Sequence, residues 1–275
     1  MGVSEPGLEL RDVRGPSALG GGWRRAAELL YLISVTEFKR SYLGTALGYL
    51  WSIARPLLLF AVLLTVFTQA FDLGNRVQQY PVLLLLNIVL FGFFQEATTQ
   101  AVSSIVNQEA VVRKTQFPRL VIPLSVVLTS AFNLGVNLVV VFAFLLAYGV
   151  DPMWTWLLLP FLLLALAGLT TTVATILSVL FPRFRDTAII WGVTVTALFY
   201  ATPVLYPIDI VSGKLRDVIS LNPLTPLFTL ARKWVIDPSA PAPDMWIVPV
   251  AIFVVLCVLA VWIFDREAPR IAEEL

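Results

Sequence analysis

Six long apolar blocks divide this sequence and constrain its fold more than any other feature. Each is about 19 to 28 residues long, and roughly 20 apolar residues let a helix cross a bilayer core about 30 Å thick. Open strands would leave backbone groups unpaired in lipid, and the blocks lack the alternation of a β-barrel. We therefore expect an all-α, polytopic membrane protein with six transmembrane helices. The blocks cover residues 47–71, 81–103, 123–148, 154–181, 188–206 and 246–264.

The composition agrees with this interpretation. Apolar residues make up 58% of the 275-residue chain and charged residues 13%, whereas roughly 25% of residues are charged in an average soluble domain. The N-terminal segment before the first block is polar and lacks the apolar core of a cleavable signal peptide. We expect the first block to remain in the protein as an uncleaved anchor.

The distribution of Lys and Arg gives the orientation. Of these 19 residues, 14 lie in the segments on the side of both termini and five lie in the opposite connections. Positively charged connections stay in the cytoplasm. Both termini are therefore expected to be cytoplasmic.

Two segments on the cytoplasmic side are predicted to be helical without crossing. In the N-terminal segment 1–46, residues 23–42 combine helically spaced apolar residues with charged ends, which is typical of an amphipathic interfacial helix. Residues 107–116 form the second helix, since Asn107 can cap its start and Pro118 stops it.

The long outer connection between the fifth and sixth blocks, residues 207–244, contains two apolar stretches that are too short to cross. They are interrupted by Asn-Pro-Leu-Thr-Pro at 222–226. Broken backbone at membrane depth needs protein or water around it. We therefore predict a re-entrant helical hairpin, within a transmembrane domain 47–264 that ends in a cytoplasmic tail 265–275.

Most of the usual catalytic residues are missing. The chain has no His and a single Cys, Cys257, which lies in the last apolar block. The pair Gly213-Lys214 is followed by Leu215 and has no P-loop spacing around it. We therefore expect no ATP site, no metal site and no bound cofactor in this chain, and no enzyme activity of its own.

Several motifs recur in an order that resembles a known family. This combination is similar to the permease subunit of type-2 ABC exporters of polysaccharide, O-antigen and teichoic acid. The segments are EFKRSYLGTALGYLW at 37–51, RPL at 55–57, KTQFPR at 114–119, IPL at 122–124, FRD at 184–186, Pro203 with Tyr206-Pro207, and NPLTP at 222–226.

The resemblance implies a channel-forming subunit in a bacterial inner membrane. It would export a polyprenyl-diphosphate-linked polysaccharide of the O-antigen, galactan, capsule or teichoic acid type. It also implies a homodimer with two separate P-loop ATPase subunits, which bind ATP and Mg. Two alternatives from other classes are a secondary transporter and a membrane-embedded polyprenyl-sugar transferase.

Charged residues near the cytoplasmic membrane surface suggest two sites. Lys39, Arg40 and Arg55 either anchor the first helix to headgroups or bind the lipid diphosphate. Glu96 lies well inside the second block, where an exposed charge costs up to about 3 kcal/mol. It belongs either to a structural polar cluster or to the substrate path.

Aromatic residues suggest where a glycan could pass. In the first block Phe60, Phe67 and Phe71 share one helical face, and the fifth block carries Trp191, Phe199 and Tyr200. Such residues either pack against helices and lipid or form a channel wall that contacts sugar rings.

Two cytoplasmic segments are candidates for docking the ATPase. The helix 107–116, with Glu109, Val112, Arg113 and Lys114, matches the coupling helix of the family that the chain resembles. Arg185, in the turn after the fourth block, either ends its helix or makes a second contact.

Overall fold

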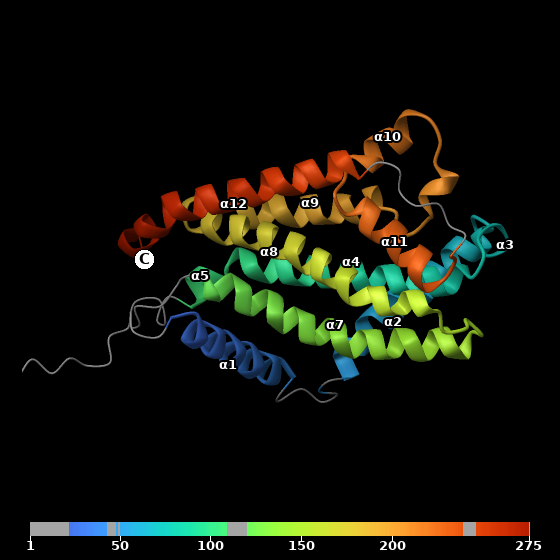
Figure 1. Ribbon diagram of the computed structural model, residues 1–275, viewed down its shortest axis with the longest axis horizontal. Coiled ribbons are helices and arrows are strands. Elements are labelled where there is room, and N and C mark those ends of the chain that lie inside the picture. The colour runs from blue at the N-terminus through green and yellow to red at the C-terminus, as the bar shows by residue number, and fades with distance from the viewer. Residues whose placement is uncertain (1–21, 43–47, 49, 109–119, 239–245, 275) are drawn as a thin grey trace, which may run out of the picture.

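The computed structural model describes residues 22–42, 48, 50–108, 120–238 and 246–274, and within them the fold is helical without strands. Five helical segments there are long and apolar enough to cross a membrane, and they run along the long axis of the molecule (Figure 1). They are α2 (Leu50–Gln69), α4 (Tyr80–Val102), α7 (Val121–Ala147), the segment formed by η1 (Trp154–Leu158) and α8 (Leu159–Arg183), and α12 (Ile247–Glu274).

The helix α4 lies at the centre of the bundle. It contacts α2, α7, α8 and α9 (Thr187–Ala201). In its most apolar window 78% of the residues are buried, against 6% in α2 and 11% in α12. An apolar helix covered on nearly all sides forms the core of a membrane bundle, whereas α2 and α12 expose apolar surface of the kind that lipid covers.

The fifth predicted span differs from the structure. Helix α9 has only 15 residues, about 22 Å at 1.5 Å per residue, which is short of a core about 30 Å thick. It ends at Ala201, and Thr202 is extended. The following residues are buried, from Thr202 to Leu205. The predicted helix 188–206 is therefore a shorter apolar helix followed by an unwound segment, and a sixth crossing stays a prediction.

Side chains of α4 satisfy the backbone of this unwound segment. The Asn87 amide donates hydrogen bonds to the carbonyls of Pro203 and Val204, both at 3.1 Å. The Tyr80 hydroxyl donates to the carbonyl of Leu205 at 3.0 Å. Unpaired carbonyls inside an apolar bundle are costly. These bonds explain how the chain leaves the helix and still lies buried.

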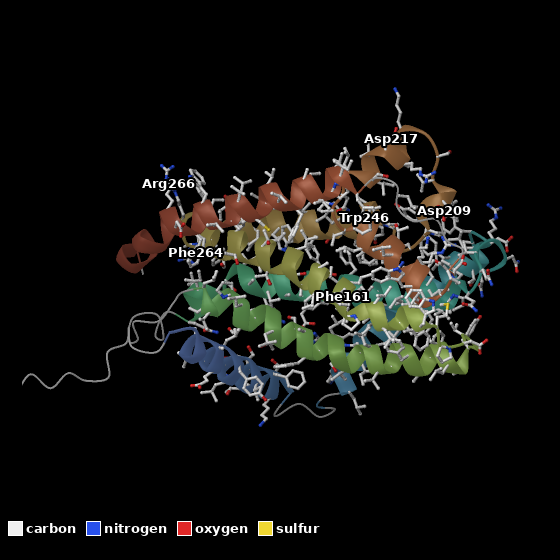
Figure 2. All side chains as sticks on the ribbon, viewed as in Figure 1. Phe161, Asp209, Asp217, Trp246, Phe264 and Arg266 are labelled. Carbon is white, nitrogen blue, oxygen red and sulfur yellow. The ribbon has the colours of Figure 1, made fainter. Side chains whose placement is uncertain are left out.

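The outer connection contains three short helices, η2 (Ile208–Ile210), α10 (Lys214–Ser220) and α11 (Thr225–Val235). Between α10 and α11 the Asn222 side chain accepts a hydrogen bond from the Leu224 amide at 3.0 Å and donates one to Thr202 at 2.8 Å. Figure 2 shows Asp209 and Asp217 here, at the end of the bundle away from Phe264 and Arg266. Two short helices form as predicted, while their re-entry into a membrane stays a prediction.

Hydrogen bonds hold the C-terminal end of α11 against the bundle. The carbonyls of Trp234 and Val235 accept hydrogen bonds from Thr155 at 2.5 Å and from the Trp156 indole at 3.1 Å. Both donors belong to η1, so the last carbonyls of α11 are satisfied by a neighbouring element. A further four-residue helix, α3 (Leu73–Arg76), follows α2 at the same end (Figure 1).

The N-terminal helix α1 (Gly22–Tyr42) packs along the first half of α7 (Figure 1). The Ser34 hydroxyl donates to the carbonyl of Ser125 at 3.1 Å, and the rings of Phe38 and Phe132 meet edge to face at 5.7 Å. The order of these contacts shows that α1 and α7 run in the same direction. A helix at residues 23–42 is confirmed, and its position in the membrane interface stays a prediction.

The predicted cytoplasmic helix 107–116 lies mostly outside the described residues. A short helix, α5 (Ser104–Asn107), continues from α4 after a bend at Ser103. Ile105 is fully buried with Ile122 and Val179, and Phe264 packs against this cluster. The ends of α4, α7, α8 and α12 that were predicted to be cytoplasmic are thus held together.

Candidate functional site: a polar face on the central helix

One face of α4 is polar although the rest of the helix is apolar. In the half of α4 predicted to be cytoplasmic, Gln95, Thr99 and Gln100 are exposed, while Gly92 and Glu96 are half-buried. Residues spaced by three or four positions lie on one side of a helix. These residues therefore share a single stripe, which we call the α4 polar face.

Neighbouring helices fix the two sides of this face. On one side the Trp191 indole of α9 donates a hydrogen bond to the Thr98 hydroxyl at 3.2 Å. On the other side the Asn133 amide of α7 donates to Glu96 Oε1 at 2.6 Å, and Arg55 of α2 interacts electrostatically with the same carboxylate. The α4 polar face therefore lies between α9 and the pair α2 and α7.

Glu96 is the acidic residue at the centre of this site. Besides Asn133, the Gln100 amide donates to Glu96 Oε1 at 3.3 Å. The residue lies six positions before the end of α4 at Val102, about 9 Å along the helix axis. Asn133 and Arg55 compensate a charge that would otherwise be expensive at such a depth.

The three cations predicted to bind a diphosphate lie on two elements. Lys39 and Arg40 are exposed at the end of α1, and Arg40 Nη1 lies 4.0 Å from Glu37 Oε1. Arg55 is exposed on α2 and interacts electrostatically with Glu96. Arg55 thus has an acidic neighbour that sequence reasoning did not identify.

The aromatic residues of the first predicted span have different surroundings. Phe60 is 8% exposed and meets Phe144 of α7 edge to face at 5.6 Å. Phe67 is half-buried and stacks at 5.1 Å on Phe71, which is exposed just beyond the end of α2. In the single chain, exposure of these three aromatic residues therefore increases from Phe60 to Phe71.

The aromatic residues of the fifth predicted span mostly face α4. Trp191 meets Phe94 at 6.1 Å, and Phe199 meets Phe91 at 5.2 Å. Tyr200 is 60% exposed. Trp191 and Phe199 therefore attach α9 to α4, and Tyr200 is the member of this group that is open to the surroundings.

Sequence reasoning missed Asn133, which binds Glu96 on another helix, and Asn87, which binds the unwound segment after α9. The available signal was the one that identified Glu96, a strongly polar residue inside a long apolar block. The docking residues Glu109, Val112, Arg113 and Lys114 lie outside the described residues. Arg185 is exposed after α8, with its guanidinium 5.1 Å from the centre of the Phe181 ring.

A bundle of apolar, membrane-length helices around a buried central helix defines a multi-pass membrane protein. Residues 28–235 match the ABC-2 type transporter family. The chain belongs to this family and is the membrane-spanning permease subunit of an ABC transporter. Its partner is accordingly an ABC ATPase subunit.

Curated relatives agree with this assignment. The chain is 31% identical to the O-antigen export system permease protein RfbA of Klebsiella pneumoniae over 251 residues, which are 90% of this chain and 95% of the relative. It is 28% identical to a protein of the same name from Myxococcus xanthus over 249 residues, with the same coverage. The resemblance seen in the sequence motifs is confirmed.

Proposed function

We propose that this protein is the channel-forming permease of an ATP-driven exporter that moves a polyprenyl-diphosphate-linked polysaccharide out of the cytoplasm, across a bacterial inner membrane. The observation that carries the proposal is the α4 polar face in a chain whose relatives are O-antigen export permeases. A hydrophilic polymer needs water-compatible walls through about 30 Å of hydrocarbon. The uncharged amides and hydroxyl of this face meet that need.

The functional unit is a homodimer with two ATPase subunits. Helix α2 has only 6% of its apolar window buried, and α9 exposes Ile189, Val193 and Tyr200. These two helices lie on opposite sides of the α4 polar face. A second copy facing them would complete an enclosed path that one copy leaves open.

The lipid carrier and the polymer use different parts of the protein. Lys39, Arg40 and Arg55 hold the diphosphate, because clustered cations attract phosphate groups. Aromatic rings of α2 and α9 contact the sugars, and the segment 222–226 closes the outer mouth. ATP hydrolysis on the partner subunits drives the polymer outward.

Lipid analysis of depleted cells tests this function. Cells that lose the protein should accumulate a polyprenyl-linked polymer inside and lose it from their surface. Proteoliposomes that contain the permease and its copurified ATPase should then move that polymer only when ATP is supplied. Export that continues without ATP would indicate a secondary transporter instead, and an unchanged lipid-linked pool would contradict a glycan exporter.

A further inference from the structure

The α4 polar face differs from the other exposed surfaces of the bundle. On α2 the exposed side chains include Leu58 and Val62, each 62% exposed, and on α12 they include Val258, also 62% exposed. In the half of α4 predicted to be cytoplasmic the exposed residues are Gln95, Thr99 and Gln100. Amides and hydroxyls gain nothing from contact with acyl chains. This face is therefore suited to water or a polar ligand.

An acidic side chain lies at the centre of this face, which disfavours a phosphate ligand there. Asn133 and Gln100 hold the Glu96 carboxylate in place. The groups that remain toward the surroundings are amides and a hydroxyl, which donate and accept hydrogen bonds and carry no net charge.

Gln95 and Thr99 are available for a ligand. Among the residues that the structure describes, neither side chain makes a hydrogen bond to another helix, unlike Thr98 and Glu96 beside them. They are four positions apart, about 6 Å along the helix. Two such groups can bind neighbouring hydroxyls of one chain-like ligand.

We infer that the α4 polar face is a binding site for sugar hydroxyls of the exported glycan, with Gln95 and Thr99 as the contacting residues and Glu96, Asn133 and Gln100 held together beside them. This inference rests on the proposed function and adds the ligand chemistry of a particular site. It separates a neutral glycan site on α4 from the diphosphate site that includes the cations of α1.

Thiol labelling tests whether the face contacts water. In a Cys257→Ser background, Gln95→Cys and Thr99→Cys are compared with Val258→Cys in the assembled transporter in inverted membrane vesicles. Ile105 and Phe264 pack in one cluster. Thr99 lies six positions before Ile105, and Val258 lies six positions before Phe264. The two labelled positions therefore lie at similar depths in the bundle. The probe is a membrane-impermeant trimethylammonium methanethiosulfonate.

We expect the two α4 cysteines to react at least about tenfold faster than the control, because thiolate formation requires water. Equal rates would overturn the inference. A disulfide between Thr99→Cys of two copies, with no labelling, would also overturn it, since the second copy would then cover the face.

An export assay tests the ligand. The double variant Gln95→Leu/Thr99→Val should lower export of the cell's own lipid-linked glycan about tenfold or more, because two hydrogen bonds are lost. Basal ATP hydrolysis should stay within about twofold of the wild type, since the ATP sites belong to the partner subunits. The pair Gln95→Asn/Thr99→Ser, which keeps the polar groups, should retain export.

Different results would overturn the proposed function and the inference about the α4 polar face. If the wild type exports the glycan and the Gln95→Leu/Thr99→Val variant exports it at the same rate, only this inference is overturned. A wild-type complex without ATP-driven glycan export would overturn the proposed function and this inference with it.

Discussion

At the scale of single residues, a few polar side chains determine how this apolar chain packs. Asn87, Asn133 and Glu96 each lie in a membrane-length helix and each binds a group on another segment. A hydrogen bond contributes about 1 kcal/mol net, whereas a buried group left without a partner costs about 1 to 3 kcal/mol. Such residues therefore select one arrangement among many that would bury similar apolar area.

Asn87 gives a direct test of this selection. Replacing it with Leu leaves the carbonyls of Pro203 and Val204 without their donor, so we expect a loss of stability of about 2 kcal/mol or more. Thermal unfolding of the purified protein in detergent measures it. Thr194→Val, on the exposed side of α9, is the control and should change the midpoint little. Equal midpoints for both variants would show that α4 does not hold the unwound segment.

At the scale of elements, α9 and the outer hairpin depend on neighbours for their positions. Helix α9 touches the bundle through Trp191, Val195 and Phe199, which face α4 and α8. Helix α11 is held through η1 and through ion pairs of Arg232 with Asp209 at 2.8 Å and Asp237 at 3.5 Å. Short helices need such contacts because their own hydrogen bonds do not stabilise them in isolation.

The aromatic residues of α2 and α9 carry the second prediction. Phe67→Ala and Trp191→Ala should lower glycan export far more than basal ATP hydrolysis, because the first removes a half-buried ring of α2 and the second releases α9, which carries the exposed Tyr200, from α4. Trp191→Phe keeps the ring contact with Phe94 and removes the hydrogen bond to Thr98, so it measures the effect of the hydrogen bond apart from that of ring packing. Export that survives both alanine variants, while Leu138→Ala abolishes it, would place the path on other helices.

Arg232 carries the third prediction. Its side chain is 16% exposed, so Arg232→Met leaves two partly buried carboxylates without their cation and should cost about 1 to 2 kcal/mol. Hydrogen exchange should become faster in α11 and η2 and stay unchanged in α4. Lys233→Met, at the adjacent position, is the control. Unchanged exchange in the Arg232 variant would show that these ion pairs do not fasten the hairpin.

At the scale of the whole molecule, the two ends of the bundle have different characters. One end gathers Ile105, Ile122, Val179 and Phe264 next to the segment predicted to dock the ATPase. The opposite end carries η2, α10 and α11 (Figure 2). A transporter needs this asymmetry, because ATP is hydrolysed on one side of the membrane and the substrate leaves on the other.

Crosslinking tests this orientation. Val112→Cys should form a crosslink to the ATPase in the assembled complex, because the segment 107–116 is short, charged and placed between two spans. Gly74→Cys, in α3 at the opposite end, is the control and should not react with the ATPase. The reverse result would invert the topology of the chain.

The sequence by itself determined the class of protein and the positions of most helices. Block lengths near 20 apolar residues predict spanning helices because lipid offers the backbone no partners. Four predicted spans match helices within a few residues, and so does the last one at its N-terminal end. The short helices of the outer connection and the helix at 23–42 also follow from local composition and turn residues.

Tertiary structure alone decided which apolar helix is central, and together with Pro203 it decided where the fifth block stops being helical. Every block is apolar, so hydropathy does not distinguish α4, which is buried by four neighbours, from α2, which is largely exposed. Pro203 disfavours a helical conformation at Thr202, which is extended, and Asn87 and Tyr80 offer the carbonyls of 203–205 partners outside a helix. Likewise Glu96, Asn133 and Arg55 are far apart in sequence and meet only because α2, α4 and α7 pack together. Contacts between distant segments set which helix is central and which polar residues meet, and local sequence carries no record of these two features.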